Sequence, residues 1–407
     1  MRRSRFQRRT LLVVTNAINN LLVPLLNPIV SLLVVRWASV AVWGEFVQVL
    51  IVVQLVTHVI GWGNKDYLLR EFSFNPARIA RAWQTSLVSR LALSAIGGSI
   101  LAVIGLPPQR ALWLAVWGLA IALDQSYDVL VVYRKDFVFA TLVELGGLAV
   151  QVAALALLAA RIDVDGLIAV FALATLGKAL VYQLRYLRQT LAGPEGRLQW
   201  IGRIDVRFFV LAFPFFLLGL SGLLQSRIDL YTVGFFLPKD QVGQYQVFTT
   251  FIIYLQSISN FVLTPFVKSL YRLTYRAILS VATRLFAFGV LLLLPGLAVI
   301  YTVLIVHYRF DLPLTFMLAG GALALPVYFY LPIIYALYKS GSQFTVVKLN
   351  LIGIAVNFAG SLLLLPRVGM IGAVIAGALA QWVMFAGYLL QSRSIRETHA
   401  VAVPELS

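Results

Sequence analysis

The chain has 407 residues, of which 60% are hydrophobic and only 12% are charged. A water-soluble domain carries about 25% charged residues, so this composition excludes an ordinary soluble fold. The net charge of +17 would suit a nucleic-acid-binding protein, but its placement between long apolar segments argues against one. Cysteine is absent, which excludes disulfides, iron–sulfur clusters and thiol catalysis.

Apolar segments dominate the chain, and each is close to the ~20 residues that one helical crossing of a bilayer requires. The sequence therefore predicts an all-α integral membrane protein with about twelve transmembrane helices and loops too short for a folded domain. The basic start, MRRSRFQRRTLLVV, lacks a following cleavage motif, so we expect an uncleaved first crossing. The predicted helices cover residues 11–35, 43–64, 83–104, 111–133, 137–160, 166–184, 208–234, 245–266, 278–306, 312–338, 343–365 and 368–391.

Basic residues are concentrated on one side of these crossings. Of the 33 Lys and Arg residues, 22 fall in the termini and the loops on that side, six on the other side and five inside predicted helices. Because positively charged loops stay in the cytoplasm, both termini are predicted to be cytoplasmic. The basic charge is thus mainly a topology signal, with a minor role in contacting anionic membrane lipid.

The two halves of the chain resemble one another. In VWGEFVQVLIVVQLV and QVGQYQVFTTFIIYL, Gly44 corresponds to Gly243 at an offset of 199 residues. Later, GLIA and GMIG place Gly166 opposite Gly369 at an offset of 203. Two landmarks with nearly equal offsets indicate two six-helix repeats.

The repeat predicts the domain organisation. It comprises an N-terminal six-helix bundle at 1–192, a cytoplasmic linker at 193–207 and a C-terminal six-helix bundle at 208–407. Because six is even, both bundles enter the membrane from the same side. Parallel repeats of this kind are related by an axis along the membrane normal, and the substrate lies between them near the midplane.

Three stretches resemble a known family. SLLVVRWASVAVWGEFVQVLIVVQLVTHVIGWGNKDYLLREF resembles the opening of Wzx-type polysaccharide flippases, which carry a Gly-aromatic pair (here Gly44 and Phe46) and a basic-acidic pair (Arg70 and Glu71). SRIDLYTVGFFLPKDQVGQYQVF resembles the second-half counterpart, with an Asp at Asp229. LLPRVGMIGAVIAGALAQ resembles the last helix of that family.

The resemblance implies a fold, a cargo and a location. The fold is the MATE-like one of the multidrug, oligosaccharidyl-lipid and polysaccharide (MOP) exporters. The cargo is undecaprenyl-diphosphate-linked oligosaccharide, flipped for O-antigen, lipopolysaccharide or exopolysaccharide synthesis. The location is the bacterial cytoplasmic (inner) membrane, where other polysaccharide assembly proteins are partners. No cofactor and no nucleic acid are expected.

Polar residues share one face in several predicted helices. Amides cost a few kcal/mol when unpaired in lipid, so these faces are expected to turn away from it. They could line a hydrated cavity that binds sugar hydroxyls, or they could form hydrogen bonds between packed helices. The cavity is favoured for the first and eighth helices, whereas the two readings are equal for His58. The candidate sugar-binding residues are Asn16, Asn20, His58, Gln256 and Asn260.

Charges inside predicted helices are the sharper signal, because each costs about 2.5–3.5 kcal/mol at a helix centre. The cations could hold a lipid diphosphate, or they could neutralise buried acids; the first reading is favoured. The acids could carry a coupling H⁺ or Na⁺, or they could belong to an ion-pair network, and here the structural reading is favoured. The candidate cations are Arg90, Lys178, Arg227 and Arg284, and the candidate ion-coupling acids are Asp124, Asp128 and Glu144.

Two alternative functions stay open. A cation-coupled drug or metabolite antiporter of the same fold would favour an acidic, aromatic cavity. A membrane glycosyltransferase or polysaccharide polymerase would need a sizeable outer loop, and the paired acids Asp163 and Asp165 lie only in a short turn. No catalytic signature is present, and the three histidines are too scattered for a metal site. The protein is therefore predicted not to be an enzyme.

The predicted topology can be tested with reporter fusions. Because the positive loops stay inside, fusions after residues 70, 195 and 400 should report a cytoplasmic location. Fusions after residues 108, 240 and 310 should report the opposite side. If the fusions after 195 and 400 lie on opposite faces, the parallel six-helix repeat is wrong.

Overall fold

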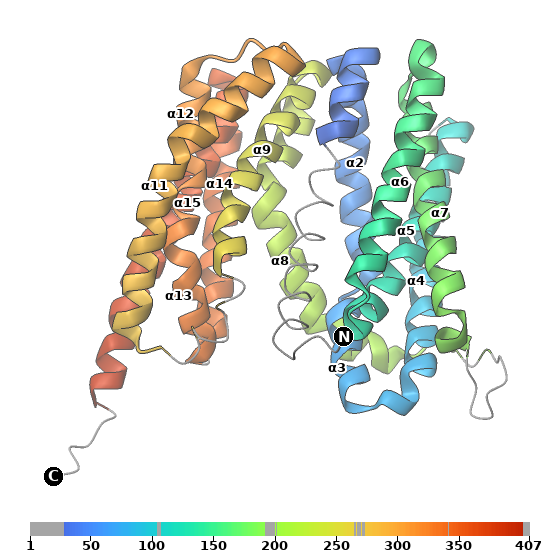
Figure 1. The fold of residues 1–407 in the computed structure, drawn as a ribbon, viewed down its shortest axis with the longest axis horizontal. Coiled ribbons are helices and arrows are strands. Elements are labelled where there is room, and N and C mark those ends of the chain that lie inside the picture. Colours follow the sequence, from blue (N-terminus) through green and yellow to red (C-terminus); the bar gives the residue numbers. More distant parts are fainter. Residues whose placement is uncertain are drawn as a thin grey trace, which may run out of the picture. The chain divides into compact units, whose positions relative to one another are not determined.

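The computed structural model is all-helical (Figure 1). It describes residues 28–103, 107–191, 200, 202–263, 266, 270, 273–340 and 342–401. The long helices are α2 (Val40–Gly61), α4 (Ile79–Val103), α5 (Pro108–Arg134), α6 (Phe137–Leu158), α7 (Val164–Leu191), α8 (Val206–Phe236), α9 (Lys239–Leu263), α11 (Tyr275–Val303), α14 (Gln343–Val368) and α15 (Met370–Val401). The shorter ones are α3 (Asn64–Phe74), α12 (Leu314–Ala324) and α13 (Val327–Lys339).

Nine helical segments within the described ranges are long and apolar enough to cross a membrane, and the bent α8 would be a tenth. Every predicted segment from 43–64 onward has a helix at its place. Of the first predicted segment, only the short apolar helix Pro28–Trp37 is described. The structure thus confirms an all-helical chain with many apolar spans.

The chain divides into two compact units, Met1–Leu220 and Ser221–Ser407, and the division falls inside α8. Helix α2 begins at Val40 and α9 at Lys239, an offset of 199 residues that equals the one between Gly44 and Gly243 in the sequence.

Aromatic side chains hold the first unit together. Phe46 on α2 is fully buried and stacks against Trp117 of α5, with the ring centroids 5.9 Å apart. It also contacts Phe171 of α7 at 4.8 Å. Because such ring pairs add to the stability gained from burial alone, they fix how α2, α5 and α7 pack.

The first part of α8 packs against the break between α2 and α3. Trp62 ends α2 in the left-handed conformation (φ 42°), and Gly63 follows at φ 67°. A Cβ on Gly63 would lie 2.5 Å from the backbone nitrogen of Phe216, so only glycine allows this approach. The Trp62 indole also donates to the carbonyl of Phe209 (3.0 Å) and stacks on Phe216.

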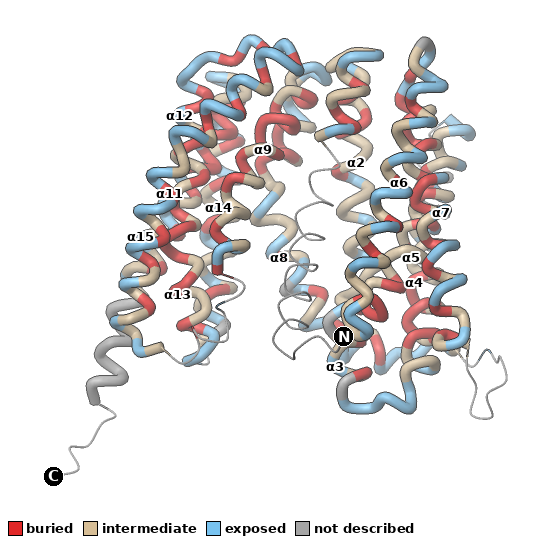
Figure 2. Tube along the Cα trace, viewed as in Figure 1, coloured by how far each residue is buried: buried red, intermediate tan, exposed pale blue. Residues whose placement is uncertain are grey.

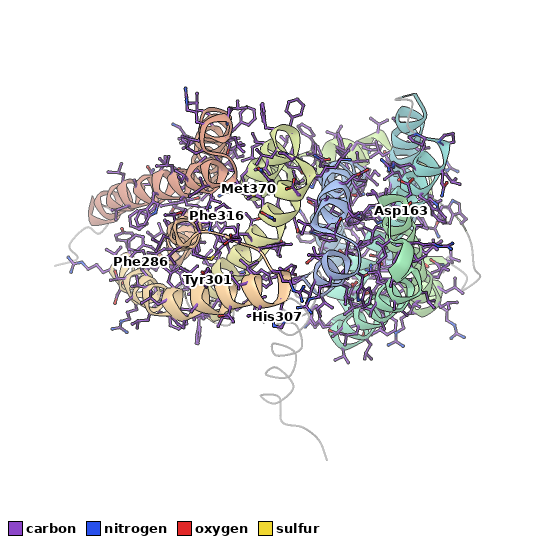
Figure 3. The ribbon with its side chains drawn as sticks, turned by 90° about the horizontal axis from the view of Figure 1, so that it is seen from above. Asp163, Phe286, Tyr301, His307, Phe316 and Met370 are labelled. Carbon is purple, nitrogen blue, oxygen red and sulfur yellow. The ribbon has the colours of Figure 1, made fainter. Side chains whose placement is uncertain are left out.

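The second unit is packed through glycines and aromatic rings. A Cβ on Gly372 would lie 2.7 Å from the backbone of Leu364, which explains how closely α14 and α15 approach. Phe316 of α12, labelled in Figure 3, meets Phe248 of α9 edge-on at 4.4 Å. A predicted single helix at 312–338 is split into α12 and α13 at Pro326, because proline cannot donate the backbone hydrogen bond of a continuous helix.

The outward faces of the helices are apolar. In Figure 2, α6 is mostly exposed or intermediate, and its exposed side chains include Leu142, Val150 and Leu157. A soluble protein would hide such a continuous apolar face, whereas a bilayer accommodates it. The exposed leucines and valines are therefore expected to contact lipid.

The close approach at Gly63 generates a stability prediction. Gly63→Ala should lower the free energy of unfolding by about 2–3 kcal/mol, because the added methyl group meets α8 backbone and the φ angle disfavours alanine. Gly118→Ala is the matched control, since nothing lies within 4 Å of its added Cβ. Thermal unfolding in detergent measures both. Equal midpoints for the two variants would contradict the packing described for Gly63.

Candidate functional site

A partly buried charge triad lies in the first unit, between α5, α6 and α7. The Lys178 ammonium on α7 donates to both carboxylate oxygens of Glu144 on α6, at 3.0 and 3.1 Å. It also lies 3.6 Å from a carboxylate oxygen of Asp124 on α5. All three side chains are less than a quarter exposed. One ammonium group is therefore shared by two carboxylates, which leaves the triad one net negative charge.

A second set of charges lies one turn further along α5. Asp128 follows Asp124 by four residues and shares its face of the helix. Its carboxylate pairs with Lys65 of α3 at 3.5 Å, and both side chains are about half exposed. Arg90 of α4 is also close enough to Asp128 for an electrostatic interaction.

Arg90 is unusual because its charge is buried without a direct partner. The residue is only 3% exposed, and its Nε and Nη1 atoms have no hydrogen-bond partner in the described structure. A buried guanidinium with two unsatisfied nitrogens is costly, which makes Arg90 a candidate for binding an anionic group.

A separate ion-pair cluster joins the ends of three helices in the first unit. Arg110, at the start of α5, pairs with Asp165 of α7 at 2.5 Å and with Glu45 of α2 at 3.4 Å. Asp163, labelled in Figure 3, lies in the turn before α7, where its carboxylate accepts from the backbone N–H of Gly166. These contacts give the turn a helix-capping role.

His58 packs against the first part of α8. Its Nε2 atom lies 3.1 Å from the carbonyl oxygen of Phe216, and the two rings stack with centroids 5.3 Å apart. A Cβ on Gly219 would lie 2.6 Å from the imidazole, so a glycine makes room for this histidine. The contact is a link between helices, which is one of the two roles predicted from sequence.

Among the described residues of the second unit, one acid is buried, and it lies on α8. Asp229 is 9% exposed, and its carboxylate accepts a hydrogen bond from the hydroxyl of the fully buried Tyr245 on α9. Arg227 interacts with Asp229 electrostatically. At the offset of 199, Tyr245 corresponds to Phe46 and Asp229 to Val30, and both counterparts are buried and apolar.

The polar face predicted on the eighth crossing is largely used in packing. Gln246 of α9 donates to the Thr250 hydroxyl at 3.2 Å, and both residues are buried. Gln256 donates to the Leu323 carbonyl of α12 at 2.9 Å. These contacts are of the interhelical and local kind that competed with a cavity wall in the sequence analysis.

The remaining predicted residues are dispersed. Asn16 and Asn20 lie outside the described residues. Asn260 on α9 and Arg284 on α11 are exposed on their helices. Of the site residues predicted from sequence, the structure brings Asp124, Glu144 and Lys178 into contact, all in the first unit.

Sequence reasoning did not single out two of the cations in these clusters. Lys65 and Arg110 lie near helix ends, where they were counted only as topology signals. Helix-end positions gave no indication that either would pair with an acid of another helix.

Comparisons with known proteins identify the fold. No protein-family profile matches the chain, and no curated protein sequence matches it. Solved structures do match. An inward-facing multidrug resistance MATE family transporter of the MOP superfamily is 14% identical, with a TM-score of 0.56, and the match covers 94% of this chain and 99% of that one.

Two further structures agree. The lipid II flippase MurJ, in an inward closed conformation, is 12% identical with a TM-score of 0.55, over 92% of this chain and 87% of MurJ. The eukaryotic MATE transporter AtDTX14 is 13% identical with a TM-score of 0.52, over 97% and 99%. These likenesses confirm the predicted MATE-like fold over nearly the whole chain.

The Asp229–Tyr245 pair generates a prediction that uses the internal repeat. Tyr245→Phe should lower the free energy of unfolding by about 1–3 kcal/mol, because it leaves a buried carboxylate without its hydroxyl donor. Adding Asp229→Val should restore most of the loss, since the double variant has the Phe–Val combination of the first half. Thermal unfolding of the single and double variants measures this. A double variant no more stable than Tyr245→Phe alone would contradict the pairing.

Proposed function

We propose that the chain is a flippase that moves undecaprenyl-diphosphate-linked oligosaccharide across the bacterial cytoplasmic membrane by alternating access. The flipped intermediate would supply cell-surface polysaccharide assembly. The first support is the fold, which is similar both to MATE transporters and to a flippase of lipid II. The sequence resemblance to Wzx-type polysaccharide flippases narrows the cargo to a lipid-linked glycan.

The observation that carries the proposal is an asymmetry between acids and bases inside the helices. Each described acid of the predicted crossings has a polar or ionic partner: Asp124 and Glu144 have Lys178, Asp128 has Lys65 and Asp229 has Tyr245. Among the same described residues, the guanidinium groups of Arg90, Arg227 and Arg284 make no ion pair and no hydrogen bond. Arg90 and Arg227 interact only electrostatically, with Asp128 and Asp229 respectively.

This surplus of positive charge fits an anionic cargo. A diphosphate carries several oxygens that guanidinium groups bind in pairs, and arginine is the residue best shaped for such contacts. A transporter of cationic drugs would be expected to leave acids free rather than bases. The fold alone favours neither cargo, because the TM-scores to the MATE transporter and to MurJ are nearly equal.

Arg90 provides the sharpest test of the charge requirement. If its guanidinium contacts the diphosphate during transport, Arg90→Gln should abolish glycan export, and Arg90→Lys should retain part of it because the charge remains. In a deletion strain, undecaprenyl-linked repeat units should accumulate on the cytoplasmic face, and only variants competent for export should clear them. Lys348→Gln, which removes an exposed cation of α14, is the matched control and should export normally.

Two outcomes would count against the proposal. If Arg90 serves only to neutralise Asp128, the double variant Arg90→Gln with Asp128→Asn would regain full export, and Arg90 would have no role in binding. If deletion causes drug sensitivity without accumulation of lipid-linked glycan, the protein is a drug antiporter of the same fold.

A further inference from the structure

In the triad of Asp124, Glu144 and Lys178, the cation between the two carboxylates is the ammonium group of a lysine side chain. Lys178 places its ammonium nitrogen within 3.1 Å of both oxygens of Glu144 and 3.6 Å from Asp124. We propose that Asp124 and Glu144 form a monovalent-cation site that Lys178 occupies permanently, so that free Na⁺ cannot bind there. This inference concerns the ion and not the cargo, so it stands or fails independently of the flippase proposal.

A glycine on α6 shapes the site for the lysine. Gly147 lies three residues after Glu144, on the same face of the helix. A Cβ at this position would lie 2.8 Å from Cδ and 3.1 Å from Cγ of Lys178. The aliphatic stem of the lysine therefore rests directly against the α6 backbone. Any larger residue would displace the stem and move the ammonium away from the two carboxylates.

The ligand set is one that a free cation could use. Hard cations prefer oxygen ligands, and three carboxylate oxygens lie 3.0, 3.1 and 3.6 Å from the lysine nitrogen. The fourth oxygen, Oδ1 of Asp124, is buried without a hydrogen-bond partner in the described structure, so it is available as an additional ligand. Two carboxylates and one ammonium leave the triad one negative charge, and a bound Na⁺ in place of the ammonium would leave the same charge.

Removal of the lysine should therefore convert the triad into a Na⁺ site. Without Lys178, two carboxylates that are less than a quarter exposed would face each other uncompensated, which strongly favours the binding of any cation that can enter. In the wild-type protein, by contrast, Na⁺ should have no effect at this site. Lys178 would thus take the place of a coupling Na⁺ at Asp124 and Glu144, two of the acids predicted from sequence to carry one.

The experiment compares thermal unfolding of the purified full chain in NaCl and in choline chloride at equal ionic strength and mildly alkaline pH. The wild-type midpoint should be the same in both salts. Lys178→Met should unfold at a lower temperature in choline and gain several degrees with Na⁺, in a manner that saturates. The gain should vanish when Asp124→Asn is added. Lys65→Met removes the cation paired with Asp128 and is the matched control, which should not respond specifically to Na⁺.

A second variant tests whether an ammonium group is what the site requires. Lys178→Ala leaves the space of the lysine stem beside Gly147 empty, and added n-propylammonium, which matches the three carbons and the nitrogen removed, should raise its midpoint more than choline does. A saturable Na⁺ stabilisation of the wild type that Asp124→Asn abolishes would overturn the proposal. Recovery of Lys178→Met on acidification but not with Na⁺ would also overturn it, because the pair would then take a proton instead of a cation.

Discussion

The absence of water in the bilayer core is the constraint on which the rest of this structure depends. A charge placed there must find its partner within the bundle, and backbone groups must be satisfied inside each helix. The first unit meets this requirement with Lys178, which joins α5, α6 and α7 through Asp124 and Glu144. The second unit meets it at Asp229 with the hydroxyl of Tyr245. The two arrangements differ in the partner of the acid, which is a charged ammonium group in the first unit and a neutral hydroxyl group in the second.

The same constraint explains why the fold could be predicted well from sequence. A crossing needs a long apolar run, so the positions of α2, α4 to α9, α11, α14 and α15 follow from composition. The helix α3 (Asn64–Phe74) was missed because it is short and polar and carries no transmembrane signal. Its start at Gly63 was visible only as a glycine in the sequence GWGNK. The need for a glycine there comes from a backbone contact with Phe216, which is distant in sequence.

The site could be predicted only in part. Sequence spacing correctly put Asp124 and Asp128 on one face, but it could not assign a cation to each of them. Lys178 pairs with Asp124, whereas Arg90 lies near Asp128 without a hydrogen bond and Lys65 takes that carboxylate instead. These pairings depend on which helices pack together, and periodicity within one helix carries no information about that. Lys65 appeared in the sequence only as one of many positive residues at helix ends.

Divergence between the two repeats connects these observations to transport. If both halves derive from one six-helix ancestor, equivalent positions began alike and now differ in their polarity. Phe46 packs among aromatic rings in the first half, while its counterpart Tyr245 holds a buried acid in the second. The first half instead carries the paired charges of α5, α6 and α7, for which the second half has no described equivalent ion pair. Two halves with a similar order of apolar segments can therefore keep their packing while each acquires its own electrostatics.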